Sequence, residues 1–206
     1  MPKIVDHDQR RQQLGEAAWR VILREGIDGA TTRLIARESG YSAGVLSHYF
    51  ESKDEILLEA LRVSHTTVKE RLNGVLEHKT GFEALRAFCY DTVPLQVAQV
   101  RETQLEMSFW SRVLVKDSLR EVQLTEASYW HEILLRVIIA AQELGELVDG
   151  DPFVVADILA GLIDGLSVHA LLIPDHYDER RLIKLIDAQL ALWSTATSEG
   201  QRGSSS

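Results

Sequence analysis

Apolar residues recur every three to four positions along most of this chain of 206 residues, and this spacing constrains its fold more than any other feature. Leu14, Ala18 and Val21 show the pattern clearly, because they fall on one face of a helix predicted over residues 8–25. The alternation of β-branched and polar residues that marks strands is scarce, and the chain contains only four prolines. We therefore predict an all-α fold of about nine helices.

Glycine, proline and capping residues predict where the helices begin and end. Gly26 is placed to end the first helix, since glycine adopts the left-handed cap conformation without strain. Ser52 and Glu55 form a capping box at the start of a later helix, and Asp151-Pro152 opens another. Beyond the N-terminal region, helices are expected over residues 52–77, 82–92, 97–114, a long segment ending near 145, 152–173 and 178–193.

Composition is typical of a soluble globular protein, with 45% hydrophobic and 26% charged residues. No uninterrupted apolar run reaches the roughly 18 residues of a membrane span, and the N-terminus is too polar for a secretory signal. The single cysteine, Cys89, excludes an intrachain disulfide and a cysteine-based zinc site. We expect a cytoplasmic protein without a metal, a cofactor or a membrane partner.

Charge is unevenly distributed along the sequence. The formal net charge is −9, yet residues 1–53 hold eight basic and seven acidic side chains, and the remaining 153 residues hold 14 and 24. The acidic excess therefore belongs to the C-terminal part. Because physiological salt screens charges beyond about 8 Å, the N-terminal segment can still present a basic face to nucleic acid.

Residues 30–50 carry the strongest indication of function. Thr31 is placed to cap a short helix that reaches Glu38, and Ser42 to cap a second short helix, with Gly40 in the tight turn between them. Two short helices joined by a glycine turn form the helix-turn-helix plan, whose second helix enters the major groove of DNA.

Side-chain size follows the same plan. Ala36 is small where the two helices would cross, and Ile35, Leu46 and Tyr49 are expected to point inward. The outward positions are then Ala43, Gly44, Ser47 and His48. A stripe of small and polar residues suits contact with base edges. An ordinary helical hairpin would share the turn at Gly40 but not the whole set.

Residues 11–61 resemble the N-terminal signature of the TetR family of transcriptional regulators. The resemblance is carried, in order and spacing, by Ala17-Ala18, Glu25-Gly26, Thr31, Ile35-Ala36, Gly40-Tyr41-Ser42, Tyr49-Phe50 and Ser52-Lys53. It implies a three-helix head that grips phosphates on either side of a groove-reading helix. The DNA-binding residues that it predicts are Thr31, Thr32, Arg33, Ser42, Ala43, Gly44, Val45, Ser47, His48, Tyr49 and Lys53.

Two departures from the family pattern concern phosphate binding, and one detail points to a subgroup. The family often has lysine at the position of Ala43 and tyrosine at that of Ser47, so two frequent phosphate contacts are missing. The run Ser47-His48-Tyr49-Phe50, together with Phe109-Trp110, is similar to regulators of the choline-to-glycine-betaine pathway.

The resemblance also implies a homodimer built through the last two helices, and the sequence offers a suitable pair. Ala160, Gly161 and Gly165 are small residues that would allow two helices to approach closely, and a stripe from Leu182 to Trp193 follows. A buried core helix is the alternative interpretation. Pairing would place two recognition helices about 34 Å apart, the repeat of the major groove.

Aromatic residues collect in the middle helices, where the family implies a cavity for a small-molecule effector. Most of them are expected to be core residues, and polar neighbours would orient the ligand. The predicted effector-binding residues are Phe88, Asp91, Glu106, Phe109, Trp110, Trp130 and His169. A quaternary ammonium ligand would suit the faces of Trp110 and Trp130 through cation–π contacts.

We thus predict a helix-turn-helix DNA-binding domain over residues 1–52, an effector-binding and dimerisation domain over 53–197, and a flexible tail over 198–206. The predicted function is a repressor that a small molecule releases from a palindromic operator. The alternative is a helical homodimer that binds a small molecule, or an enzyme, without a DNA role. No metalloprotease, phosphate-loop, nucleophile-elbow or dinucleotide motif is present, so we predict no enzymatic activity.

Overall fold

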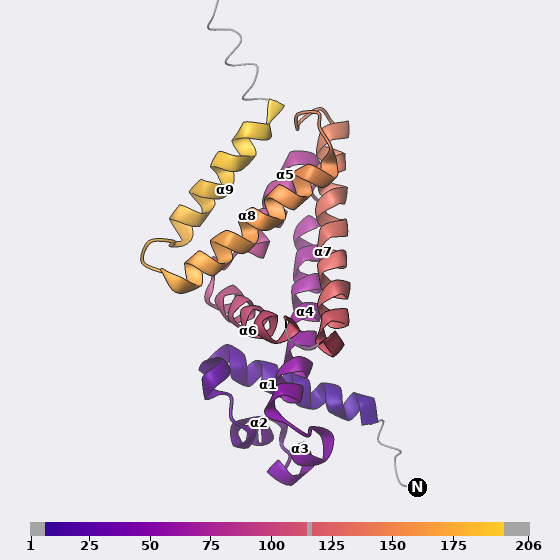
Figure 1. Cartoon of the computed structure of the whole chain (residues 1–206), viewed down its shortest axis with the longest axis vertical. Helices are drawn as coiled ribbons and strands as arrows, with labels where there is room; N and C mark the ends of the chain where they lie inside the picture. The colour runs from indigo at the N-terminus through magenta and orange to yellow at the C-terminus, as the bar shows by residue number, and fades with distance from the viewer. Residues whose placement is uncertain (1–6, 115–116, 196–206) are drawn as a thin grey trace, which may run out of the picture. The chain divides into compact units, whose positions relative to one another are not determined.

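The described part of the protein is helical. The computed structural model describes residues 7–114 and 117–195, and within them it contains nine α-helices and one isolated β-bridge, between Leu147 and Ser194 (Figure 1). The helices are α1 (His7–Gly29), α2 (Thr32–Ser39), α3 (Ala43–Tyr49), α4 (Lys53–Leu76), α5 (Gly81–Thr92), α6 (Val97–Val113), α7 (Asp117–Glu143), α8 (Pro152–Leu172) and α9 (Glu179–Trp193). The predicted all-α fold is confirmed.

Glycine sets two of the helix ends that position the head. Gly26 has φ 76° and ψ 174°, which breaks α1 where its end was predicted, and one further turn continues to Gly29. Gly40 ends α2 with φ 73°, in the left-handed region that favours glycine. The following chain then turns into α3.

The predicted capping box at the start of α4 is confirmed in one half only. The Ser52 hydroxyl accepts a hydrogen bond from the N–H of Glu55 at 3.3 Å. The Glu55 carboxylate accepts from the N–H of Glu51 at 3.1 Å instead of that of Ser52. The reciprocal bond thus forms one residue earlier than predicted, after the extended residue Phe50.

The chain divides into two compact units, and the division falls inside α4 and α6. The first unit contains α1, α2, α3, α4 as far as Glu70 and α6 over Arg101–Arg112; the second contains the rest of the chain. These compact units therefore do not follow the predicted boundary at residue 52. That boundary separates a DNA-binding from an effector-binding domain by function, and it stays a prediction. The predicted flexible tail, 198–206, lies outside the described residues.

Each unit has its own buried core. In the first unit the apolar stripe of α1 is buried, with Leu14 and Val21 at 0% exposure. There α1 packs against α2, and α2 packs against α3. In the second unit α7 packs against α5 and α8, and α9 packs against α5. The cluster there includes Phe88, Leu134 and Leu159. Figure 1 shows α8 and α9 running in opposite directions, joined by the short loop before Glu179.

One described helix, α8, is long and apolar enough to cross a membrane by length and composition, which differs from the expectation of no such segment. Its Asp157 and Asp164 are too few to exclude it from that class. Core helices of soluble proteins meet the same criterion. In this structure 39% of its most apolar window is buried, through residues such as Val155 and Leu159.

Candidate nucleic-acid interface and effector site

The helix-turn-helix is fixed by local capping and by a small buried core. Thr31 and Ser42 accept hydrogen bonds from the N–H groups of Leu34 and Val45, each at 3.3 Å. Each hydroxyl thus satisfies one of the N–H groups left open at the start of α2 and α3. The hydroxyls predicted to meet DNA at Thr31 and Ser42 therefore already act as helix caps.

The inward positions of the predicted motif are buried. Ile35 is 1% exposed, Ala36 5% and Leu46 2%. Tyr49, also expected inside, is only half-buried. The reason is that Tyr49 ends α3 and its ring contacts the rings of His7 and His48, which are both exposed. The expectation of a fully inward Tyr49 is thus met only in part.

One side of α3 and of its cap is exposed, and we call it the bare side of α3. It carries most of the residues predicted to face the groove, namely Ser42, Ala43, Gly44, Ser47 and His48. Val45 is half-buried. The Ser47 hydroxyl donates to the carbonyl of Ala43 at 3.2 Å, one turn back, so its oxygen can still accept from a base. Contact of these residues with DNA stays a prediction.

The predicted phosphate-binding residues flank this side. Thr32 and Arg33, at the start of α2, are exposed. Lys53, at the start of α4, is also exposed, and its ammonium donates to the carbonyl of Ile27 at 3.4 Å. That single long bond leaves two N–H donors of Lys53 available. Arg37 of α2 is a further exposed cation, outside the set of residues predicted to bind DNA.

Other basic residues of the head are engaged within it. Arg20 and Arg24 of α1 pair with Glu38 of α2 at 3.1 and 3.3 Å. The hydrogen bond from Arg20, assisted by that from Arg24, lowers the pKa of Glu38. These cations join α1 to α2, so they add less to the DNA-facing charge than their number indicates.

Arg11 organises the junction of α1, α3 and α4, and the sequence analysis gave it no role. Its Nη1 donates to the carbonyl of Tyr49 at 2.7 Å, its Nε pairs with Glu59 at 3.2 Å, and its guanidinium lies 4.5 Å from the ring centre of Phe50. The residues next to Arg11 in the sequence do not indicate this role, because its partners are more than 35 residues away.

The seven predicted effector-binding residues are divided between the two units. Glu106, Phe109 and Trp110 belong to the first. There Phe109 is 1% exposed, and Glu106 is held by His65 Nε2 at 2.7 Å and by the indole N–H of Trp110 at 2.8 Å. These groups already bond to each other, and Phe109 packs in the core.

In the second unit Phe88 and Trp130 come together, with ring centres 6.1 Å apart in an edge-to-face arrangement. Asp91, one turn after Phe88 on α5, pairs through Oδ1 with Arg71 Nε at 2.9 Å. Its other oxygen, Oδ2, is buried and has no hydrogen-bond partner in the part of the chain that the structure describes. His169 lies apart from this pair: it is exposed near the end of α8 and stacks on Tyr177 at 5.0 Å.

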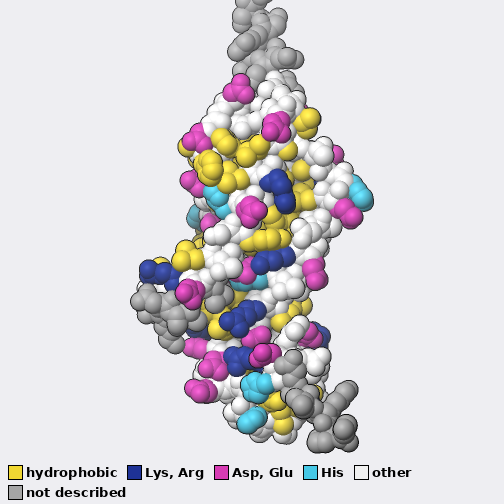
Figure 2. All heavy atoms as spheres, turned by 90° about the vertical axis from the view of Figure 1, so that its right-hand side faces the viewer, with side chains coloured by type: hydrophobic (Ala, Val, Ile, Leu, Met, Phe, Trp, Pro, Cys, Tyr) yellow, Lys and Arg dark blue, Asp and Glu magenta, His cyan; other side chains and the backbone are white. Residues whose placement is uncertain are grey.

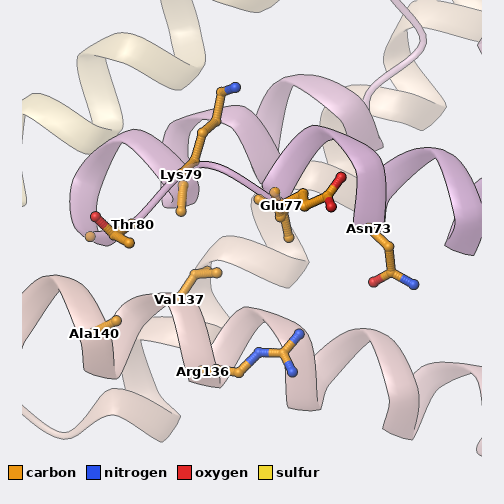
Figure 3. A pocket seen from close by; sticks show the side chains of 10 residues that line it. Asn73, Glu77, Lys79, Thr80, Arg136, Val137 and Ala140 are labelled. Atoms are coloured by element: carbon orange, nitrogen blue, oxygen red, sulfur yellow. The ribbon is translucent and has the colours of Figure 1, made fainter.

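A pocket of about 300 Å³ lies elsewhere in the second unit, and none of the seven predicted residues lines it (Figure 3). Leu76, Ala84 and Val137 supply apolar lining. In Figure 3 the side chain of Glu77 follows the end of α4, that of Arg136 lies on α7, and that of Lys79 points away from α7. Glu146 Oε2 accepts from the N–H of Phe82 at 2.8 Å, so a carboxylate already occupies the nearby start of α5.

Several large apolar side chains near the start of α8 are exposed. Phe153 is 58% exposed, Val154 53% and Ile158 48%. A Cβ added at Gly161 or Gly165 would meet no atom within 4 Å. Figure 2 shows hydrophobic side chains gathered on the upper part of one face, in the unit that contains α7 and α8. Among the described residues, none covers the two glycines.

Two family descriptions match most of the chain. Residues 14–60 match "Bacterial regulatory proteins, tetR family", and residues 82–193 match "BetI-type transcriptional repressor, C-terminal". The first covers the helix-turn-helix, and the second covers α5 to α9.

Named relatives agree with these matches along nearly the whole chain. The HTH-type transcriptional regulator PksA of Bacillus subtilis is 31% identical over 192 residues, which cover 90% of each protein. The HTH-type transcriptional regulator BetI of Vibrio campbellii is 30% identical over 203 residues, which cover 94% of this chain and 98% of the relative.

Solved structures share the fold. A transcriptional regulator from Saccharomonospora viridis in complex with choline superposes with a TM-score of 0.77 at 25% identity, covering 88% of this chain and 95% of the other. A transcriptional regulator from a Rhodococcus species gives 0.73 at 27% identity, covering 89% and 95%. With its tetR-type helix-turn-helix and its BetI-type C-terminal region, the chain belongs to the TetR family of transcriptional regulators.

Proposed function

We propose that this regulator represses transcription by binding a palindromic operator as a homodimer, and that a small-molecule effector releases it. The observation that carries the DNA-binding part is the bare side of α3, where Ser47 and His48 are exposed while Leu46 is buried beneath them. A short helix held by its buried side presents its opposite side to the major groove. Arg33 and Lys53 flank that side and supply phosphate contacts.

The dimer is built through α8 and α9. Exposed Phe153, Val154 and Ile158 form an apolar surface on α8, and a second copy would cover it. The open space above Gly161 and Gly165 lets a partner helix approach closely. Pairing of this kind also accounts for the apolar character of α8 in a cytoplasmic protein, without a membrane.

The effector site is centred on Phe88, Trp130 and Asp91. The two rings already meet, and aromatic faces bind cationic ligands. A buried carboxylate oxygen without a partner is costly, by about 1–3 kcal/mol, so the free Oδ2 of Asp91 favours a ligand that brings an O–H or N–H donor. The related regulator crystallised with choline supports a quaternary ammonium alcohol, which carries both a cation and a hydroxyl.

The switch works through α4. Arg71, which pairs with Asp91, lies on α4, and the same helix begins at Lys53 beside the recognition motif. A cationic ligand that donates to the other oxygen, Oδ2, shares this carboxylate with Arg71 and repels its guanidinium, and thereby shifts the balance between two positions of α4. By linkage, operator DNA must weaken effector binding by the same factor as the effector weakens operator binding.

An effector-binding helical dimer without a DNA role is the second candidate, and an enzyme is the third. The relatives are named as transcriptional regulators, which favours the first proposal. An enzyme would use groups that the repressor account leaves aside, such as Glu77 and Arg136 at the pocket in Figure 3.

The test is a gel shift with the intergenic DNA upstream of the protein's own gene, with and without choline chloride. Binding that withstands excess random duplex and weakens with choline supports the whole proposal. Binding that choline leaves unchanged refutes the choline-type effector but not the DNA role. Choline binding in calorimetry together with no shift of any DNA establishes the second candidate.

A further inference from the structure

We infer that His7, at the start of α1, belongs to the DNA-contacting surface and donates a hydrogen bond to a backbone phosphate beside Tyr49. This inference rests on the proposed DNA-binding function. It adds to the interface a residue that lies outside the helix-turn-helix segment. The ligand group is the phosphodiester of the duplex.

Three rings join the start of α1 to the end of α3. The ring centres of His7 and Tyr49 are 4.6 Å apart, those of His48 and Tyr49 5.3 Å, and those of His7 and His48 6.5 Å. Both histidines are exposed, and Tyr49 between them is half-buried. His7 therefore lies on the same outer edge as His48, which is predicted to meet the groove. Figure 2 shows exposed histidines at the lower end of the molecule, in the unit that contains the head.

The position of His7 is set by Arg11, one helical turn later. Residues four apart lie on the same face of a helix, so the contacts of Arg11 fix the face that His7 shares. Arg11 bonds to the carbonyl of Tyr49 at 2.7 Å and lies over the ring of Phe50 at 4.5 Å. The first turn of α1 is thus held against the end of α3.

The chemistry at this edge favours an anion. Among the described residues, no hydrogen bond or ion pair engages the imidazole of His7 or of His48, so their N–H groups are available to a ligand. Asp8 is the adjacent residue, and side chains one position apart on a helix do not face each other.

A phosphate contact here would add to the donors that α3 offers. The Ser47 hydroxyl already donates its proton to the carbonyl of Ala43 at 3.2 Å, so it brings no free donor to the DNA backbone. His7 supplies a donor from another helix at the neighbouring edge. No pattern in the helix-turn-helix segment reveals it, because His7 is 24 residues before Thr31.

The test compares three variants on two labelled duplexes of 30 base pairs, one recovered from a random library by selection with the wild-type protein and one of random sequence. His7→Ala removes the ring and its donor. His7→Phe keeps the ring packing against Tyr49 and removes only the donor. Gln9→Ala is the matched control, since Gln9 is exposed on the first turn of α1 and has no ring contact. Fluorescence anisotropy gives each dissociation constant.

We expect His7→Ala and His7→Phe to weaken binding by about ten- to a hundredfold on both duplexes, as the loss of one hydrogen bond to a charged group predicts. Equal losses are expected because phosphate contacts carry no sequence information. Wild-type affinity of His7→Phe would show that the ring only packs, and wild-type affinity of His7→Ala would show no role; either result overturns the inference. If the wild-type protein itself binds neither duplex, the proposed function fails, and the inference fails with it.

Discussion

Substitution of Gly161 by leucine separates the stability of the protomer from the stability of the dimer. A Cβ at this position meets no atom within 4 Å, so the protomer accommodates the side chain. Leucine also favours a helix interior over glycine by about 1 kcal/mol. The folded protomer should therefore be as stable as the wild type or slightly more so, whereas a partner helix that approaches the bare glycine should be pushed away.

The loss in dimer stability can be estimated from the exposed side chains around it. Phe153, Val154 and Ile158 are each about half exposed. Full burial of such a side chain contributes about 1.5–3 kcal/mol, so covering the exposed halves contributes roughly 1 kcal/mol each, or about 6 kcal/mol for two copies. Losing half of this, about 3 kcal/mol, weakens the dimer by roughly a hundredfold.

Sedimentation equilibrium measures the dimer constant, and urea unfolding followed by circular dichroism measures the protomer. Gly74→Leu is the matched control, because Gly74 is exposed on α4 and an added Cβ there also meets nothing within 4 Å. The control should remain dimeric. An unchanged dimer constant for Gly161→Leu would refute the assignment of α8 to the dimer interface.

Three further predictions concern the head, the effector site and the core. Lys53→Ala should weaken binding to every duplex and flatten the dependence of log affinity on log salt, whereas His48→Ala should change the preference at one base pair by about 1–3 kcal/mol. Both effects are measured by fluorescence anisotropy in a potassium chloride series. Equal losses for His48→Ala on selected and random DNA would contradict base contact. Asp91→Asn should replace the buried carboxylate that faces Arg71 with a neutral amide and destabilise the protein by about 1–3 kcal/mol in urea. A double variant with Arg71→Gln that loses the full sum of the single losses would show that the pair is not coupled. Burial raises the pKa of Cys89 from 9.0 to about 12, so the stability that depends on the neutral thiol is present below pH 9 and is lost as pH rises toward 12. Cys89→Ala should remove this alkaline loss of stability. An identical pH profile of unfolding in both proteins would contradict this prediction.

Local signals in the sequence were enough to predict the helices and the orientation of the recognition motif. Caps such as Thr31 and Ser42 and the turn at Gly40 act within four residues, so their geometry follows from neighbouring residues alone. The burial of Leu46 and the exposure of Ser47 follow in the same way, because a short helix has only one apolar side that it can turn toward the core.

The residues of the proposed effector site could not be predicted as a set, because the proposed site depends on pairings between distant residues. Phe88 and Phe109 have the same apolar character, yet one meets Trp130 and the other is enclosed in the first unit. Glu106 is held by His65, 41 residues earlier in the chain. Only the folded chain reveals which carboxylate retains an oxygen without a partner.

The role of Arg11 was missed for the same physical reason. Its contacts to Tyr49, Phe50 and Glu59 join three helices, and no helical repeat or cap in the sequence marks them. A basic residue on the polar side of an amphipathic helix is ordinarily interpreted as solvated.

The central claim is that the bare side of α3 recognises a particular DNA sequence, and a competition titration tests it directly. Wild-type protein is titrated onto a labelled duplex recovered by selection from a random library, with random duplex as competitor at fixed salt. We predict a preference of about a thousandfold or more, and recovered sites with two half-sites about one helical turn apart. Equal affinity for both duplexes, or a library that yields no enriched sequence, would contradict the account.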